Sequence, residues 1–495
     1  MWPQTPGAED GRVTETVAGL YLSPLECLVL LGAVALVVAR RLPPAVRTRV
    51  TAAAGAVVLL ATIVLSAVGL RWQMLPVLAG AALASLLAVS RPIRRTGRPA
   101  WRAGWWAALP ASMACVGLIA MGPLAAWALP VPVFPEPSGR FAVGTRVVQW
   151  TDPRRPESFT ADPHDRRTVV VQLWYPARES PAGARRARYL GRTEQEARTV
   201  SDALARQVGL PGFLVDGAPR AHTHAVFDAP VAGGGGRFPV VLFSPGSGGV
   251  RTQNTAWAED LASHGYVVAA LDHPYDSAAV VLADGRTIHT RTVSTGDRDK
   301  DDELAAAWTA VRAADLSFVL TELDRASRDG NAGPPAGRLD TGRAAVTGHS
   351  MGGAAALQAA RNDRRFAAVI DLDGYPHGPA SPTLRRPTLA LTQAVTPATD
   401  PRYVPRLTRA LERNTAPSYR LTLPGAAHLT FMDGPLYLPP VPSIVGSLGR
   451  AESPRVVSAT TRAFLDSVLR PRPGDPAAVL SAHGDLHVHR PGDDR

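Results

Sequence analysis

The chain has 495 residues, which is too long for one small domain, and it carries a formal net charge of +11. The basic excess is almost wholly arginine, because Lys300 is the only lysine. No basic patch interleaved with aromatic residues accompanies this excess, so we do not expect nucleic-acid binding. Cys27 and Cys115 are the only cysteines and both fall in apolar segments, which excludes a disulfide framework and zinc–cysteine chemistry.

Long apolar runs dominate the first 135 residues. Four of them cover residues 17–38, 50–70, 74–89 and 105–129. Each is near the length that crosses a hydrocarbon core, the third being the shortest. A signal peptide has only one short apolar region, so four runs exclude that interpretation. We therefore expect residues 1–135 to form an all-α membrane domain of about four transmembrane helices.

Arginines flank these runs asymmetrically. The loops after the first and third runs are rich in arginine, at Arg40, Arg41, Arg47, Arg49, Arg91, Arg94, Arg95, Arg98 and Arg102. The N-terminal segment is acidic instead, and the loop after the second run has only Arg71. Positive residues favour the cytoplasmic side, so this pattern predicts both rich loops inside and both chain termini outside. The same pattern disfavours the alternative of a helical bundle buried in a soluble protein.

A second domain is predicted after the proline-rich linker at residues 130–137. Alternating residues at 147–150 and 168–175 predict its first strands. Residues 193–208 have the pattern of an amphipathic helix, which either covers a pocket or is a plain surface helix.

A buried strand at residues 236–243 then ends in the glycine-rich turn 244–249, which exposes backbone N–H groups. This turn lacks the Lys-Ser/Thr ending of a P-loop, so a role in cradling phosphate is disfavoured.

Residues 344–360 combine an apolar strand, a sharp glycine-flanked turn and a helix of small residues, with Ser350 at the tip. This is the Gly-x-Ser-x-Gly pattern of a nucleophile elbow, which holds a serine hydroxyl clear of the sheet. Such a serine needs a base, an acid that orients the base, and N–H groups that stabilise an oxyanion. For the oxyanion we assign the backbone N–H groups of Ser247 and Met351.

The candidate bases are the histidines that follow Ser350. His428 lies just past the strand-like residues 419–423, where a loop at the carboxyl end of a strand can present a base. His377 sits in a turn and is either a surface residue or part of a pocket wall. The remaining three lie in the polar tail, at His483, His487 and His489. We assign the base to His428.

The acid has two candidate positions. The first strand beyond the elbow helix ends in Asp371 and Asp373, and Asp373 is at its tip, where it can face the site. The second strand, at residues 387–392, is followed by no carboxylate until Asp400. We favour Asp373, and Asp371 and Asp400 remain the alternatives. The polar tail, residues 471–495, is predicted to be disordered.

These segments together resemble the plasma and isoform II type of the platelet-activating factor acetylhydrolase family, over roughly residues 140–470. The matching motifs are Phe238-Pro-Val-Val-Leu-Phe-Ser-Pro-Gly, Asp272-His273, Gly-His-Ser-Met-Gly-Gly, Leu372-Asp373 and His428. The resemblance implies an α/β-hydrolase fold with Ser350, Asp373 and His428 as the catalytic residues and Ser247 and Met351 as the oxyanion donors. One departure is Pro245, where the family often has histidine. Actinobacterial cutinase-like polyester hydrolases share Ser-Pro-Gly here, but they keep their acid after the later strand.

The sequence therefore predicts a multi-pass cell-membrane protein with an α/β-hydrolase catalytic domain at residues 136–470 on the outer side. We expect a serine esterase that needs no metal or organic cofactor. Its expected partners are membrane lipids and a small-molecule or lipid ester, most consistent with a short-acyl phospholipid. The alternatives are a cutinase- or lipase-like esterase for polyesters or xenobiotics, and a noncatalytic membrane sensor on the same fold.

Overall fold

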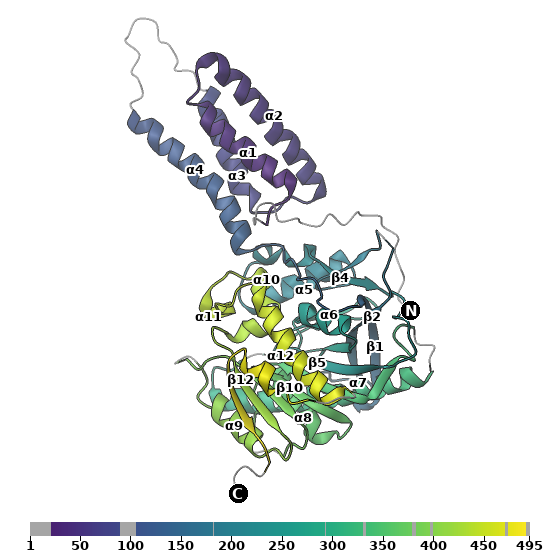
Figure 1. Ribbon diagram of the computed structural model, residues 1–495. Helices are drawn as coiled ribbons and strands as arrows, with labels where there is room; N and C mark the ends of the chain where they lie inside the picture. The colour runs from purple at the N-terminus through teal and green to yellow at the C-terminus, as the bar shows by residue number, and fades with distance from the viewer. Residues whose placement is uncertain are drawn as a thin grey trace, which may run out of the picture. The chain divides into compact units, whose positions relative to one another are not determined.

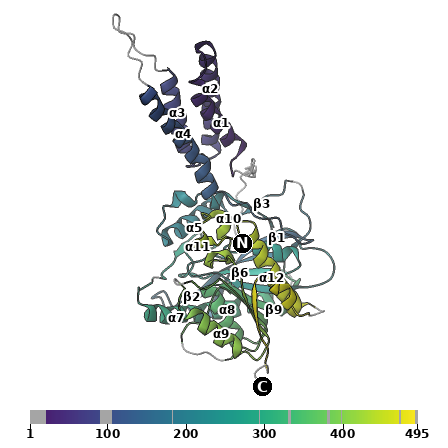
Figure 2. The same cartoon turned by 60° about the vertical axis from the view of Figure 1, so that its left-hand side comes forward.

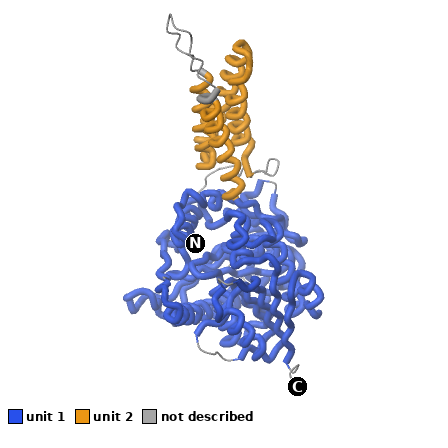
Figure 3. Tube along the Cα trace, turned by 90° about the vertical axis from the view of Figure 1, so that its left-hand side faces the viewer, with its two compact units in different colours: residues 1–11, 132–495 blue, residues 12–131 orange. Residues whose placement is uncertain are grey.

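The computed structural model describes residues 21–89, 105–181, 183–292, 294–329, 333–378, 383–396, 399–470 and 474–491. These residues fall into two compact units, one within residues 12–131 and one within residues 132–495, which Figure 3 colours separately. The acidic N-terminal segment and the arginine-rich loop after the third apolar run lie outside the described residues. The predicted positions of their charges therefore stay predictions.

Helices make up the described part of the smaller unit (Figure 1): α1 (Pro24–Ala39), α2 (Pro44–Val68), α3 (Met74–Val89) and α4 (Trp105–Ala128). Helix α1 packs against α2 and α3, and α3 packs against α4. The helices approach closely at glycines. A Cβ atom at Gly32 would lie 2.6 Å from Val58 Cγ2, and one at Gly122 would lie 2.2 Å from Val77 Cγ2. Small residues at helix contacts are how helices pack in lipid.

The outward faces of these helices are apolar. Large side chains such as Leu31, Leu60 and Leu86 are 64 %, 64 % and 69 % exposed, where a water-facing helix would carry polar groups. Inside the unit, Glu26 and Arg71 form a buried ion pair of 3.3 Å. The large apolar side chains on the outer faces are what is expected of a bundle that lies in lipid.

Within the described ranges, three helices are long and apolar enough to cross a membrane: α2, residues 109–128 of α4, and α7 (Arg298–Asp329). Helix α7 belongs to the larger unit and packs in its core through Leu316 and Leu320. Helices α1 and α3 have 16 residues each, about 24 Å at 1.5 Å per residue, which is shorter than a hydrocarbon core of about 30 Å. The number of membrane crossings therefore stays a prediction.

A mixed sheet of eleven strands is the centre of the described part of the larger unit. Its order is β13-β12-β11-β10-β9-β5-β6-β2-β1-β4-β3. The six strands from β12 to β6 run parallel to one another. The strands are β1 (Ala142–Pro156), β2 (Arg166–Ala177), β3 (Arg186–Arg188), β4 (His222–Phe227), β5 (Phe238–Ser244), β6 (Val267–Asp272), β9 (Leu339–His349), β10 (Phe366–Leu372), β11 (Thr388–Thr392), β12 (Ser418–Thr422) and β13 (Asp485–His489). A separate hairpin pairs β7 (Ala279–Val281) with β8 (Thr287–His289).

Helices cover both faces of this sheet, as can be followed in Figure 2. Alternate residues of a strand point to opposite faces. Val241 and Phe243 of β5 accordingly join one apolar core with α6 (Thr255–Ser263) and α12 (Glu452–Leu469). Val240 and Leu242 join a second core with α7, α8 (Met351–Asn362) and α9 (Tyr403–Glu412). This layered arrangement confirms the predicted α/β-hydrolase fold.

The chain reverses direction across the sheet at β5. After β5 it continues to β6 on one side, and α7 then returns it to β9 on the other side of β5. A crevice opens outside the carboxyl ends of parallel strands at such a switch point. Ser244 at the end of β5 pairs with Gly348 near the end of β9. The turn after β5 and the turn after β9 therefore lie side by side.

The described part of the tail, residues 474–491, differs from its predicted disorder. Residues Ala477–Ser481 form α13, and β13 pairs antiparallel with β12 over five residue pairs. Leu480 is fully buried, and Leu486 and Val488 pack against the same core. Two alternating apolar residues in a polar segment are too weak a pattern to predict a strand. The open edge of β12 supplies the partner that makes this segment a strand.

Candidate active site

Ser350 stands between β9 and α8 in a strained conformation, with φ 56° and ψ −122°. A side chain is rarely held at positive φ unless the surroundings enforce it. The flanking glycines serve close packing instead. A Cβ atom at Gly348 would lie 2.2 Å from the carbonyl group of Gly352, and one at Gly352 would lie 2.0 Å from Ser244 O. The Gly-x-Ser-x-Gly spacing thus lets the elbow pack tightly against the end of β5.

His428 joins Ser350 to Asp373. Its Nε2 lies 3.0 Å from Ser350 Oγ, and its Nδ1 lies 2.6 Å from Asp373 Oδ2. The His428 side chain is 41 % exposed whereas that of Asp373 is 1 % exposed. The hydrogen-bonded chain therefore runs from an accessible imidazole to a buried carboxylate. His428 comes from the 3₁₀ turn His428–Phe431 that follows β12, and Asp373 follows β10.

Asp373 is held from four directions. Besides His428, its oxygens accept hydrogen bonds from the backbone and the side-chain amide of Gln393, both at 2.9 Å, and from the Tyr403 hydroxyl at 2.6 Å. Burial and the neighbouring Asp373 raise the pKa of Tyr403 well above its ordinary value, so the hydroxyl stays a donor. No sequence pattern singles out Gln393, which follows β11, or Tyr403, which is the first residue of α9.

The other candidate acids do not contact His428. Asp371 lies within β10, fully buried, and its Oδ1 accepts a hydrogen bond from Gly374 N at 3.0 Å. Burial, and then the charge of Asp373, raise the pKa of Asp371 well above its ordinary value. Asp400 is bonded to Tyr375 and Arg402 instead.

The remaining histidines after Ser350 have other partners or lie elsewhere. Nδ1 of His377 lies 3.0 Å from Asp302 Oδ1, next to the turn after β10. His487 and His489 belong to β13 at the edge of the sheet, and His483 lies between α13 and β13.

The turn after β5 leaves a single N–H group unused. Gly246 N donates to Gln253 Oε1 at 3.0 Å, Gly248 N to Asp276 Oδ1 at 3.4 Å, and Gly249 N to Gly246 O at 2.9 Å. Pro245 has no N–H. Only Ser247 N–H in this turn therefore lacks an acceptor among the described residues. Met351 is the first residue of α8, where an N–H has no partner within its own helix.

His349, the residue before Ser350 in the elbow motif, links the three turns of the site. Its Nδ1 accepts from Gln253 Nε2 at 3.0 Å, and its Nε2 lies 3.0 Å from the backbone oxygen of His428. These partners assign the proton to Nε2, so the ring is neutral. Burial, and then His428, lower the pKa of His349 to about 3. Gln253 also holds Gly246, so the bridge extends from the turn after β5 to the turn after β12.

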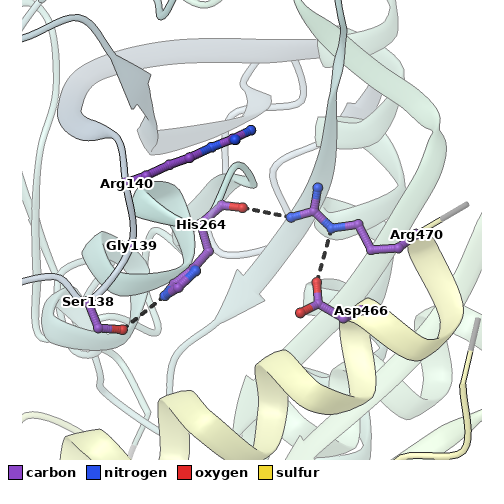
Figure 4. Close-up of a pocket in the computed structure, with 6 residues that line it drawn as sticks. All are labelled: Ser138, Gly139, Arg140, His264, Asp466 and Arg470. Atoms are coloured by element: carbon purple, nitrogen blue, oxygen red, sulfur yellow. Dashed lines mark hydrogen bonds and ion pairs between the residues drawn. The ribbon is translucent and has the colours of Figure 1, made fainter. Parts of the chain in front are cut away.

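A cavity of about 480 Å³ lies elsewhere in this unit (Figure 4). It is lined by Ser138, Gly139, Arg140, His264, Asp466 and Arg470. Arg470 donates to Asp466 and to the backbone oxygen of His264, and Ser138 contacts the His264 ring. None of the residues around Ser350 lines this cavity. The candidate active site is thus defined by its hydrogen bonds and its place at the switch point.

The parallel sheet, the helices on both faces and the strained serine turn at the switch point define an α/β-hydrolase. The chain also matches the family model described as platelet-activating factor acetylhydrolase, isoform II, over residues 130–296 and 335–470. That match covers more than half of the chain. The protein therefore belongs to this family, which confirms the family predicted from the motifs.

Two curated relatives carry esterase and acetylhydrolase names. A probable 1-alkyl-2-acetylglycerophosphocholine esterase of Arthroderma benhamiae is 28 % identical over 255 residues, covering 49 % of this chain and 59 % of the relative. A platelet-activating factor acetylhydrolase of Bos taurus is 28 % identical over 171 residues, covering 28 % of this chain and 36 % of the relative. The chain thus spans less than two thirds of the length of these curated relatives.

A solved ferulic acid esterase from Streptomyces cinnamoneus shares the architecture. It superposes with a TM-score of 0.56 at 30 % identity, and the match covers 71 % of this chain and 97 % of that structure.

Proposed function

We propose that the protein is a serine esterase that hydrolyses carboxylic esters through an acyl-enzyme. The observation that carries this proposal is the hydrogen-bonded chain from Ser350 through His428 to Asp373. In it His428 Nε2 faces the serine hydroxyl while Nδ1 faces a buried carboxylate. That arrangement suits proton transfer from an attacking serine. A noncatalytic sensor would have no need of a strained serine with a base aligned on it.

In the proposed reaction, Ser350 Oγ attacks the ester carbonyl and His428 takes the hydroxyl proton. The same imidazole then gives the proton to the leaving alcohol. Asp373 keeps the Nδ1–H tautomer and stabilises the imidazolium. The oxyanion is bound by the N–H groups of Ser247 and Met351, which is supported by the free N–H of Ser247. Water activated by His428 releases the acid, and no metal or organic cofactor enters these steps.

The proposed substrate is an ester with a short acyl group, in particular a short-acyl phospholipid ester. The names of the two curated relatives support this class. Each methylene changes transition-state binding by only about 1–3 kcal/mol in an apolar pocket, so we expect a graded preference. The ferulic acid esterase neighbour supports a second candidate, an aromatic acyl ester.

We further propose that residues 1–135 anchor the enzyme in the cell membrane, with the hydrolase domain at residues 136–470 outside. The apolar outer faces of α1 to α4 and the close glycine contacts between them support a bundle in lipid. The arginine-rich loops support a cytoplasmic position for the connections between the first two and the last two helices. Such an anchor would keep the enzyme beside lipid substrates.

The test uses the full chain in detergent micelles. We expect a fluorophosphonate probe to label Ser350 and Ser350→Ala to lose both labelling and ester hydrolysis. Ser481→Ala, an exposed serine in α13, is the matched control and should behave as the wild type. Labelling at another residue, or full activity in Ser350→Ala, would contradict the proposal.

The substrate class is tested with a ladder of acyl esters that includes sn-2 short-acyl phospholipids and a feruloyl ester. We expect acetyl to butyryl esters to be cleaved fastest, and the phospholipids to be cleaved without calcium. A calcium requirement would contradict the cofactor-free mechanism. Preference for long-chain triglyceride or a polyester film would favour the lipase- or cutinase-like alternative, and preference for the feruloyl ester would favour the aromatic one.

A further inference from the structure

An arginine is buried directly beneath the turn after β5. Arg312 lies in the middle of α7 and is fully buried. A guanidinium has five N–H donors, and a buried charge is tolerated only when its donors are paired. Here all five are used. Three go to Ser244 Oγ at 3.3 Å, to Pro245 O, and to Gly246 O at 3.0 Å. The other two go to the carboxylate of Asp276, at 2.5 and 2.7 Å.

Asp276 extends this contact to the far side of the same turn. Its Oδ1 accepts the hydrogen bond from Gly248 N, while Ala278 N donates to Gly248 O at 2.9 Å. Although burial alone would raise the pKa of Asp276, the Arg312 guanidinium keeps that pKa below its ordinary value. The Arg312–Asp276 ion pair therefore holds the peptide groups on both sides of Ser247.

Further groups fix the base of the turn. Ser244 Oγ lies 2.9 Å from His273 Nε2, and His273 Nδ1 lies 2.9 Å from Asp315 Oδ2, all three side chains being fully buried. Gln253 holds Gly246 N from the opposite side. Gly248 has φ 65°, a conformation that favours glycine, and a Cβ atom there would collide with the Gln207 side chain. The turn thus has one arrangement, in which the Ser247 N–H is the donor left free.

We propose that Arg312, paired with Asp276, is the positioning residue of the oxyanion hole: it binds the carbonyl groups of Pro245 and Gly246 and so aims the Ser247 N–H at the reacting carbonyl. The inference rests on the proposed function, because it needs Ser350 to form a tetrahedral adduct. Arg312 itself does not touch the substrate. Its effect is on the transition state, where the oxyanion forms, and not on ground-state binding.

Lysine cannot replace this arginine. Its ammonium is a point charge with three donors and cannot bind a carboxylate side-on while also reaching three oxygens of a turn. Arg312→Lys keeps the charge and removes the planar guanidinium group that binds several acceptors at once. Loss of one oxyanion donor costs about 10²–10³-fold in kcat. We therefore expect Arg312→Lys to lower kcat by about 10²-fold, with KM changed by less than about threefold. Asp276→Asn keeps the shape of its side chain and should lower kcat by about tenfold.

The experiment measures kcat and KM of the full chain on a short-acyl ester, normalised to sites labelled by a fluorophosphonate. It also measures the inhibition constant of a short alkyl boronic acid, whose serine adduct places an oxygen in the oxyanion hole. In Arg312→Lys we expect this constant to rise by the same factor as kcat falls. A merely structural arginine would lower the number of labelled sites and leave kcat per site and boronate affinity unchanged. Arg325→Lys, an exposed position on the same helix, is the matched control.

Each outcome decides the proposal. Wild-type kcat per labelled site in Arg312→Lys, or a change confined to KM, would overturn it. If neither Arg312→Lys nor Asp276→Asn folds, the ion pair serves the stability of the fold and the positioning role is withdrawn. If the wild type itself is neither labelled at Ser350 nor active on any ester, the proposed function fails first. Only an active wild type with a normal Arg312→Lys refutes the positioning role alone.

Discussion

Replacing Asp373 by asparagine should almost abolish turnover while leaving the fold intact. The structure indicates how the new amide would be oriented. Oδ1 accepts hydrogen bonds from Gln393 N and the Tyr403 hydroxyl, whereas Oδ2 accepts from Gln393 Nε2 and His428 Nδ1. The backbone N–H of Gln393 cannot rotate, so the amide oxygen of the introduced side chain takes the Oδ1 position. The NH₂ group of that side chain must then face His428.

An NH₂ group facing Nδ1 reverses the tautomer of His428. Nδ1 becomes the acceptor, the proton moves to Nε2, and the nitrogen that faces Ser350 can no longer take the hydroxyl proton. A wrong tautomer of this kind costs about 10⁴-fold in kcat, which is about 5.4 kcal/mol of activation free energy. The assay is kcat on a short-acyl ester, together with thermal unfolding to show that the variant is folded.

Asp371→Asn is the matched control, because Asp371 is buried away from His428 and asparagine has nearly its shape. We expect a loss of less than about tenfold in kcat there, and a similarly small loss in Asp400→Asn, because neither carboxyl group touches the base. If Asp373→Asn retains activity within about tenfold of the wild type, our assignment of the orienting acid is wrong. If Asp400→Asn is the inactive variant, the acid has the later-strand position of the cutinase-like hydrolases.

Three further outcomes follow from the same structure. The pKa of His349 in the folded chain is about 3, below its ordinary 6.5, so the unfolded chain binds the proton first as pH falls, and up to about 5 kcal/mol of the stability present above pH 6.5 is lost towards pH 3. In His349→Gln this part of the pH dependence of the unfolding free energy, measured with urea, should vanish. The same pH dependence in wild type and variant would argue against it. Deleting residues 474–491 should destabilise the hydrolase unit by at least about 2 kcal/mol, because it removes buried Leu480 and uncovers the edge of β12; an unchanged melting temperature would show that the tail adds nothing. Protease added to intact cells should release the chain after residues 130–137, and protection of that region would invert the proposed topology.

Much of this protein was predictable from local sequence. The elbow is a strand, a turn and a helix within about twenty consecutive residues, so its glycine spacing already specifies the conformation of Ser350. The apolar runs likewise carry their own information, since their length and flanking arginines need no tertiary partner to be recognised. His428 and Asp373 were predicted to meet because each follows a predicted strand, and the carboxyl ends of parallel strands lie at one edge of the sheet; the structure places them in hydrogen-bond contact.

Only the tertiary structure decided the contacts between residues that lie far apart in the chain. No periodic pattern in the sequence connects such residues. In the sequence Arg312 is one more position of a long helix, and only the packing of α7 against β5 brings it into contact with the turn after β5. Tyr403 is an ordinary aromatic residue until α9 places its hydroxyl on Asp373. The polar tail becomes a strand because β12 leaves an unpaired edge. In each case the deciding interaction is a hydrogen bond whose partner lies far away in the chain, and that partner is set by the order of the strands and not by the local sequence.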